Sequence, residues 1–121
     1  MWVYTGIMDI EIPIQALTIN QAFQGRRFKT RKYQIFEKEM FILLPNKEMV
    51  KGWVEVSYEY GLTPSSFSIS DVGNLEKCLS DVLVKKGYIE DDRKILKLVQ
   101  KKVQSPRFYV KISIKKTKLC P

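Results

Sequence analysis

Alternating apolar and polar residues predict three β-strands along the chain. Apolar side chains occupy every second position in residues 8–14, 53–60 and 107–115. Such alternation places the apolar side chains on one face of an extended segment. Pro13 indicates an edge strand or a strand end, because proline lacks the N–H that a central strand donates.

A fourth strand is expected over residues 94–103, although its apolar residues also fit helical spacing. We favour a strand because residues 107–115 would then form its hairpin partner, with the turn at residues 104–106. Gly61 and Pro64 are expected to end the strand at residues 53–60.

Apolar residues at helical spacing predict two helices. The first covers residues 30–44, with Thr30 as a plausible N-cap and Pro45 as the stop; its apolar face consists of Tyr33, Phe36, Met40 and Leu44. The second begins near Asn74 and ends before Gly87, a C-terminal cap; its apolar face consists of Leu75, Cys78, Leu79, Val82 and Leu83. Cys78 is therefore predicted to be a buried, inert thiol rather than a nucleophile.

The order β-α-β-α-β-β predicts an α+β fold in which two helices cover a small mixed or antiparallel sheet. The chain has 121 residues, so we expect one domain over residues 1–121. No apolar run approaches the ~20 residues that span a bilayer, and the N-terminal residues do not resemble a secretory signal. We expect an intracellular, cytoplasmic protein without a membrane partner.

Charge and missing residue types narrow the chemistry. The chain has a net charge of +8 and no histidine, which excludes Ser-His-Asp and Cys-His nucleophilic systems. Two cysteines do not suffice for a structural zinc site, and neither a dinucleotide fingerprint nor a P-loop is present. Carboxylates that hold a hard divalent cation are the remaining natural candidate for catalysis.

A basic and aromatic segment at residues 23–33 indicates nucleic-acid binding. It interleaves five cations with three rings, a composition that suits phosphate contacts and stacking on bases. The members are Arg26, Arg27, Lys29, Arg31 and Lys32, with Phe23, Phe28 and Tyr33. The alternative is a solvated loop that runs into the first helix.

Aspartates flank the second helix, in residues 70–95. Asp71 precedes the helix, and Asp91 and Asp92 follow it. They are either cap and turn residues or ligands of a metal ion that faces a phosphate. A helix of 13 residues is about 20 Å long, so a site shared by both ends within one chain is at the limit of reach. The polar face of the helix presents Asn74, Lys77, Asp81 and Lys85.

These residues resemble the signature of RusA-type Holliday junction resolvases, D-x-D-N-L-x-K, then D-x-L, then G-x-x-x-D-D. The match runs without gaps over about 25 residues, from Asp71 through Lys77 and Asp81 to Asp92. Asn20 and the basic segment lie where family members carry an Asn-bearing loop and a basic stretch. The resemblance implies a homodimer that binds four-way DNA junctions and makes paired nicks with Mg²⁺, or Mn²⁺, without a small-molecule cofactor. It also suggests a bacteriophage or prophage origin.

Carried over by position, the resemblance implies Asp71 and Asp92 as metal ligands, with Lys77 stabilising charge on the scissile phosphate. Asp91 is a further candidate ligand, and Asp81 is interpreted as structural or supporting. The implied DNA-binding residues are Asn20, Arg26, Arg27, Lys29, Arg31, Lys32 and Asn74.

Gly73 departs from the pattern, because the family has its second aspartate there. Three outcomes follow: a weaker one-metal site, rescue by Asp91 or Glu76, or a protein that binds junctions without cutting them. We favour retained activity because Asp71, Lys77 and Asp92 are all present. The alternatives are a non-catalytic DNA-binding protein and a small basic RNA-binding protein.

Overall fold

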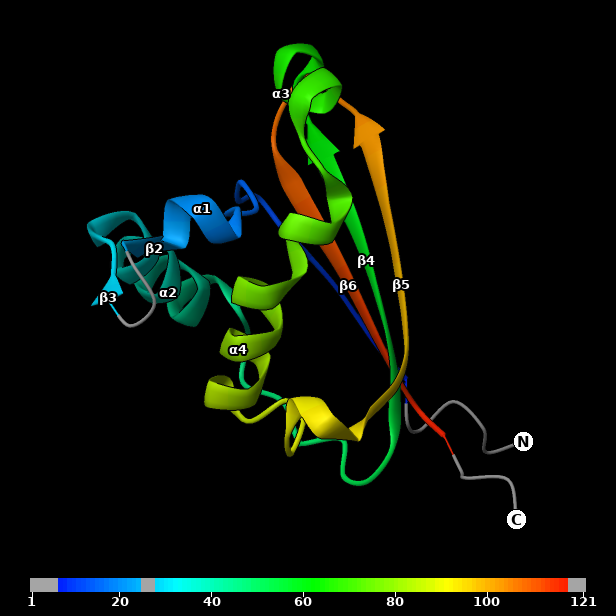
Figure 1. Ribbon diagram of the computed structural model, residues 1–121. Helices are drawn as coiled ribbons and strands as arrows, with labels where there is room; N and C mark the ends of the chain where they lie inside the picture. The colour runs from blue at the N-terminus through cyan, green and yellow to red at the C-terminus, as the bar shows by residue number, and fades with distance from the viewer. Residues whose placement is uncertain (1–6, 25–27, 118–121) are drawn as a thin grey trace.

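The computed structural model describes residues 7–24 and 28–117. Its strands are β1 (Ile7–Ile12), β2 (Phe23–Gln24), β3 (Phe28–Lys29), β4 (Val54–Leu62), β5 (Ile95–Gln104) and β6 (Tyr109–Lys116). Its α-helices are α1 (Ile19–Ala22), α2 (Arg31–Leu43), α3 (Pro64–Ile69) and α4 (Glu76–Lys86), and its described 3₁₀ helices are η2 (Val72–Asn74) and η3 (Asp92–Lys94). This arrangement confirms the predicted α+β class (Figure 1).

The main sheet is mixed, with the strand order β1-β6-β4-β5. β6 runs antiparallel to both β1 and β4, while β5 runs parallel to β4. The predicted hairpin between β5 and β6 is therefore wrong, because β4 lies between them. Ser105 N donates to the carbonyl of Leu62 (2.8 Å), so the connection passes the end of β4 before the chain returns as β6. A parallel β4–β5 pair instead needs a crossover, which α3 and α4 supply.

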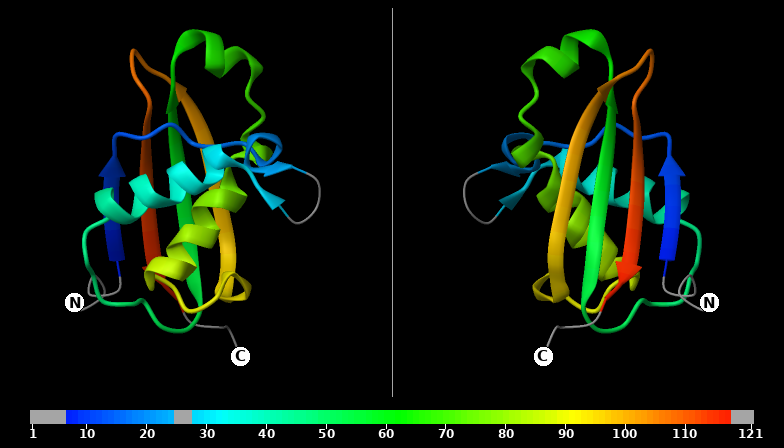
Figure 2. Two further views of the ribbon diagram at one scale, coloured as in Figure 1. Left: turned by 90° about the vertical axis from the view of Figure 1, so that its left-hand side faces the viewer. Right: turned by 90° about the vertical axis from the view of Figure 1, so that its right-hand side faces the viewer.

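All the described helices lie on one face of this sheet, and within residues 7–24 and 28–117 no helix covers the other face, here called the bare face (Figures 1 and 2). The strand alternation explains this, because the covered face is apolar and the bare face polar. Buried strand residues on the covered face include Val54, Val56, Tyr58, Tyr60, Val110, Ile112 and Ile114.

The two long helices form where the sequence predicts them. Thr30 caps α2 by accepting a hydrogen bond from the Tyr33 backbone N–H (3.2 Å). α4 ends at Gly87, whose φ of 84° is a left-handed conformation that favours glycine. The predicted apolar faces are all buried, Cys78 among them. The longest described helix has 13 residues, and none in the described ranges is long and apolar enough to cross a membrane.

Short features escaped the sequence analysis: α1, the β2–β3 hairpin, α3 and the two described 3₁₀ helices. Each is too short to show a period, and α1 is fixed by a reciprocal hydrogen-bond pair between Thr18 and Gln21. The prediction that Gly61 ends β4 was also wrong, because the strand continues to Leu62. Gly61 is needed there for space, since a Cβ atom would lie 2.0 Å from the Tyr109 ring.

Candidate active site

Lys77 and Asp92 meet although α4 and a turn separate them in the sequence. Lys77 lies in the first turn of α4, and its Nζ is 3.6 Å from Asp92 Oδ2. Residues 87–91 therefore carry the chain back towards the beginning of the helix. The same Nζ is 3.1 Å from Asp81 Oδ1, one helical turn further along. One cation thus links two of the four aspartates that the family signature shares with this chain.

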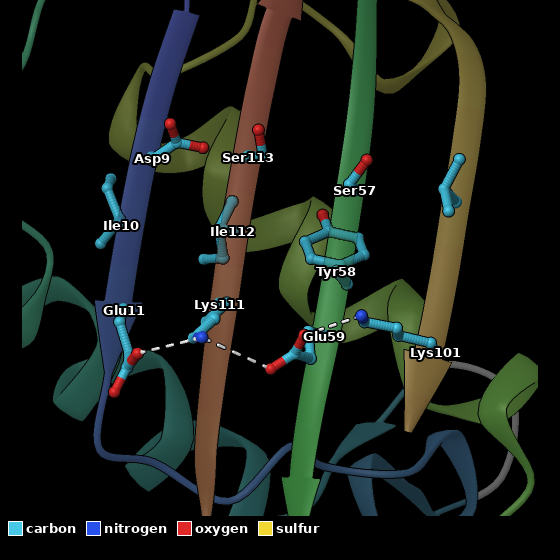
Figure 3. A pocket seen from close by; sticks show the side chains of 11 residues that line it. Asp9, Ile10, Glu11, Ser57, Tyr58, Glu59, Lys101, Lys111, Ile112 and Ser113 are labelled. Carbon is cyan, nitrogen blue, oxygen red and sulfur yellow. Dashed lines mark ion pairs between the residues drawn. The ribbon is translucent and has the colours of Figure 1, made fainter. Parts of the chain in front are cut away.

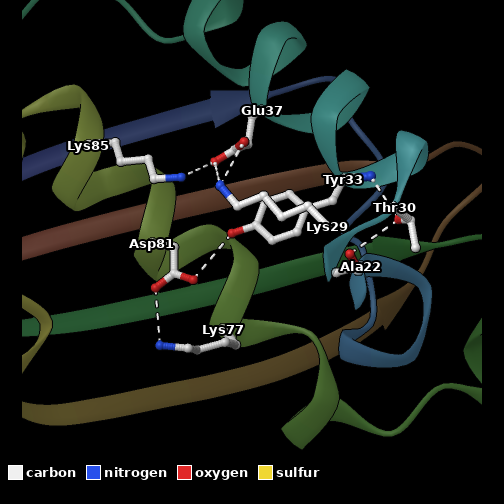
Figure 4. Close-up of polar contacts among 8 residues, drawn as sticks. All are labelled: Ala22, Lys29, Thr30, Tyr33, Glu37, Lys77, Asp81 and Lys85. Atoms are coloured by element: carbon white, nitrogen blue, oxygen red, sulfur yellow. Dashed lines mark hydrogen bonds and ion pairs between the residues drawn. The ribbon is translucent and has the colours of Figure 1, made fainter. Parts of the chain in front are cut away.

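A buried tyrosine, Tyr33, holds Asp81 in place through a hydrogen bond. Its hydroxyl donates to Asp81 Oδ2 (3.2 Å), and its ring is fully buried at the start of α2 (Figure 4). Burial raises the pKa of Tyr33, and the charge of Asp81 raises it further. The hydroxyl therefore stays protonated and remains a donor. Asp81 accepts from Tyr33 with one oxygen and contacts Lys77 with the other.

Lys77 is a fixed positive charge. Its hydrogen bond to Asp81 raises the pKa of Lys77, and the charges of Asp81 and Asp92 add to this effect against partial desolvation. The ammonium group therefore does not act as a general base at neutral pH. It is suited to neutralise anionic oxygens such as those of a phosphate.

Asp71 is an exposed N-cap residue, as the simpler sequence interpretation expected. Its Oδ1 accepts a hydrogen bond from Gly73 N (3.0 Å) at the start of η2. The segment before it is held by Lys102, whose Nζ donates to the carbonyls of Phe67 (2.6 Å) and Ser70 (2.9 Å). A carboxylate that caps with one oxygen retains lone pairs for another ligand.

Asp91 is engaged by Arg93. Both of its carboxylate oxygens accept hydrogen bonds from that residue, with an ion-pair distance of 3.0 Å. The side-chain hydrogen bonds from Arg93 lower the pKa of Asp91, and the Arg93 backbone N–H adds to the effect. A metal ion at Asp91 would therefore have to compete with a guanidinium group.

The candidate metal ligands do not form a complete protein site in the described part of the chain. Within residues 7–24 and 28–117, no group of three or more His, Cys, Asp or Glu side chains is placed to hold a metal. Magnesium, however, is often bound through one or two carboxylates together with substrate phosphates and water. Asp71 contacts Gly73 N and Asp92 contacts Lys77, and no contact within the described residues joins these two carboxylates.

Packing does not impose the glycine at position 73. Its φ is not positive, and a Cβ atom there would meet only Asp71 Oδ1, at an ordinary 3.5 Å. The backbone at position 73 therefore leaves room for the Cβ atom of another residue. Glycine instead of the family's aspartate at position 73 therefore removes a carboxylate without a requirement from the backbone.

The described part of the basic segment lies beside α4. Lys29 Nζ is 3.2 Å from Glu37 Oε2 and 4.9 Å from the centre of the Tyr33 ring, and Lys85 of α4 also pairs with Glu37 (Figure 4). Tyr33, the last residue of the basic segment, thus contacts both Lys29 and Asp81. The two clusters that the sequence presented separately are joined in the fold.

Arg31 and Lys32 are exposed in the first turn of α2. Cations are unfavourable at this end of a helix, because its dipole is positive there. Their placement is therefore not explained by helix stability and suits contact with an anionic partner. Arg26 and Arg27 lie outside the described residues. Asn20 on α1 is exposed and Asn74 in η2 half-buried.

A match to a known protein family shows to which family this chain belongs. The family model described as endodeoxyribonuclease RusA matches residues 18–115, most of the chain. The chain belongs to the RusA family. No curated protein matches it. β1 precedes the matched region, which includes the basic segment, α4 and all of β6 except its last residue.

Membership of the RusA family implies a DNA-binding endonuclease that acts on Holliday junctions, in the setting of DNA recombination. Enzymes of this type generally depend on a divalent metal. The exposed cations and the Lys77 network are consistent with that chemistry, and the family match supplies the class of substrate.

Sequence reasoning missed two supporting residues. Tyr33 appeared only as a member of an apolar face and of the basic segment, and Lys102 only as one of many lysines. No local pattern reveals either role, because Tyr33 meets Asp81 across 48 residues and Lys102 meets Ser70 across 32.

Proposed function

We propose that this chain is a divalent-metal-dependent endodeoxyribonuclease that binds four-way DNA junctions as a homodimer and resolves them by paired nicks. The observation that carries the proposal is the position of Lys77, fixed between Asp81 and Asp92 beside a basic segment in a RusA-family chain. A two-fold dimer would match the two-fold symmetry of a junction and present one site to each of two opposed strands.

Asp71 and Asp92 would hold the metal, with Mg²⁺ the first choice and Mn²⁺ the second. When bound, such a cation neutralises phosphoryl oxygens and promotes attack by water on phosphorus. The ammonium group of Lys77 would face the scissile phosphate and stabilise the negative charge that increases there during the reaction. Asp81 and Tyr33 would keep the ammonium group oriented throughout.

The basic segment would position the DNA. Arg31 and Lys32 at the start of α2, together with Lys29, Arg26 and Arg27, would contact the phosphate backbone. Asn20 and Asn74 would add hydrogen bonds near the same strands. These contacts are not expected to read base sequence, because they are aimed at the backbone.

A second candidate function is junction binding without cleavage. Gly73 favours it, since the site has one carboxylate fewer than the family pattern. The proposal nevertheless keeps catalysis, because one or two carboxylates with a phosphate suffice for magnesium.

The test separates cutting from binding. D71N and D92N are expected to slow cleavage of a synthetic four-way junction by about 100-fold or more, while junction binding and folding stay unchanged. K47A, on the exposed loop after α2, serves as the matched control and should cut normally. Normal cutting by D71N and D92N would refute the metal site. Preference for structured RNA in competition with the junction would refute the choice of substrate.

A further inference from the structure

Asp71 lies in a segment that the hydrophobic core does not hold firmly. Within residues 63–74, all of them described, every residue is half-buried or exposed, although the residues directly before and after the segment are buried. Of its apolar side chains, Phe67 and Val72 pack partly against the core. A segment with so little buried surface opens easily unless polar contacts restrain it.

Lys102 of β5 provides such contacts from the sheet. It is aligned with Tyr60 of β4, whose buried side chain places Lys102 on the face of the sheet that the helices cover. Its Nζ donates to the carbonyls of Phe67 (2.6 Å) and Ser70 (2.9 Å). The same Nζ lies 4.6 Å from the centre of the Phe67 ring, a cation–π distance. One ammonium group therefore makes three contacts with the segment.

The two carbonyls lie at a helix end, where backbone acceptors lack partners. The last four carbonyls of an α-helix have no N–H of the same helix to bind, and α3 ends at Ile69 with Ser70 as its C-cap. The backbone N–H of Ser70 binds the carbonyl of Ser66 (2.9 Å). Lys102 binds two further carbonyls, and a cation is favoured at this end of a helix. The last turn of α3 contains no basic residue of its own.

The carbonyl of Ser70 is directly connected to Asp71. It belongs to the same planar peptide unit as the Asp71 backbone nitrogen, so a restraint on its oxygen also restrains the start of Asp71. On the other side, Asp71 Oδ1 accepts from Gly73 N (3.0 Å), and the Asp71 carbonyl accepts from Asn74 N (3.0 Å). Lys102 thus restrains the backbone before Asp71, and η2 restrains the carboxylate after it.

We propose that Lys102 is a positioning residue of the candidate site, which fixes Asp71 by holding the carbonyl of Ser70. The inference rests on the proposed function, in which Asp71 is a metal ligand, and adds a residue of β5 to that site. Distances between a metal ion and its ligands vary by only about 0.2 Å, so a loosened Asp71 should bind the metal less well. In this role Lys102 contacts neither the metal nor DNA.

The neighbouring Lys101 offers a matched control. Its side chain points to the opposite face, because successive side chains of a strand alternate. There it pairs with Glu59 (3.2 Å) and is 66% exposed (Figure 3). The variants K101M and K102M therefore remove the same charge from adjacent positions on the two faces of the sheet. An effect of net charge alone should be equal in both.

The first measurement is amide hydrogen exchange of the protein without DNA or metal. K102M should raise the exchange rates of the Gly73 and Asn74 amides at least about tenfold, because the segment opens more often. K101M should exchange as wild type does, and K102R should stay close to it, since a guanidinium group retains donors for both carbonyls. The α4 amides should be unchanged in all three variants, which shows that the rest of the fold is intact.

The second measurement is junction cleavage as a function of magnesium concentration. K102M should raise the concentration that half-activates cleavage at least about fivefold, because Asp71 is less well placed. K102R should recover most of this loss. Junction binding in a chelator should be the same for K102M and K101M within about twofold, because both lose one charge.

Each outcome decides the proposal. Faster exchange at Gly73 and a higher magnesium requirement, both confined to K102M, would support it. Unchanged exchange, a magnesium requirement equal to that of K101M, or weaker junction binding by K102M alone would overturn it, and weaker binding would make Lys102 a phosphate contact. Faster exchange throughout α4 would also overturn it, because Lys102 would then support the whole fold. A wild type that never cuts would refute the proposed function, whereas exchange at Gly73 would still show whether Lys102 fixes Asp71.

Discussion

At the scale of single residues, the site depends on how Lys77 is held. An exposed lysine side chain samples many rotamers, and fixing one costs conformational entropy. Here Asp81 and Asp92 restrain the ammonium group, and Tyr33 fixes Asp81 through a buried hydroxyl. Tyr33 is therefore a positioning residue that acts on the reaction through Asp81 and Lys77.

The variant Y33F tests this role. It removes only the hydroxyl and should cost about 1 kcal/mol of stability, the usual net value of one hydrogen bond. Y88F is the matched control, because the Tyr88 hydroxyl donates to the Pro45 carbonyl away from the site. Both variants should lose similar stability in urea melts, but only Y33F should slow junction cleavage. Equal cleavage rates in the two would show that Tyr33 is merely part of the core.

The variant G73D tests the missing carboxylate. Gly73 is exposed and a Cβ atom there makes only an ordinary contact, so stability should change by less than ~1 kcal/mol, as for most exposed positions. A third carboxylate should lower the magnesium concentration that half-activates cleavage. G73N, which has the same size without the charge, is the control. If both variants need as much magnesium as wild type, position 73 does not contribute to the metal site.

At the scale of secondary structure, the contact between α2 and α4 unites the basic segment with the aspartates. Glu37 of α2 pairs with Lys85 of α4 and with Lys29, and its side chain is only 17% exposed. Partial burial raises the pKa of Glu37, but the hydrogen bonds from Lys85 and Lys29 outweigh burial and lower it. Protonation of Glu37 should therefore loosen this contact.

The sign of the pH effect follows from linkage. A lowered pKa means that the Glu37 contribution is complete above the unfolded value of about 4.3 and is lost as the pH falls through the lower folded value. E37Q should be about 1 kcal/mol less stable than wild type at pH 7, and the difference should shrink towards zero in acid. E48Q, on an exposed stretch, is the control. A difference between E37Q and wild type that does not change with pH would contradict the assignment.

The sequence predicted the helices and strands better than it predicted which strands pair with each other. Thr30, Gly87 and the apolar face of α4 were readable because caps and helical periods are local signals. The β5–β6 hairpin was wrong because alternation shows which face a strand buries but not which strand lies beside it. The meeting of Lys77 with Asp92 depends on the return of residues 87–91, and that of Tyr33 with Asp81 on the docking of α2. Neither long-range contact leaves a local trace.

At the scale of the whole molecule, the net charge of +8 attracts nucleic acid before any specific contact forms. The arrangement of charged side chains differs between the two sides of the molecule. On the bare sheet face acids and bases alternate, whereas Arg31 and Lys32 are both exposed at the start of α2, at a position where a cation does not stabilise the helix. DNA should therefore bind on the helical side.

Salt dependence locates the DNA contact. If Arg31 and Lys32 each neutralise one phosphate, the double variant R31A/K32A should reduce the slope of log affinity against log salt by about 2 for duplex arms. K47A/K51A removes the same charge from an exposed loop and should leave the slope nearly unchanged. Equal losses in the two double variants would mean that only net charge matters and that the start of α2 is not the binding surface.

The central claim is that this chain cuts four-way junctions with a metal held by Asp71 and Asp92. The most direct measurement is the time course of cleavage of a synthetic four-way junction, with magnesium or with a chelator, and with linear duplex of the same sequence as the control. The account predicts paired nicks on opposed strands that require magnesium, occur only on the junction and disappear in D92N. Junction binding without nicks at any magnesium or manganese concentration, or nicks that persist in the chelator, would contradict it.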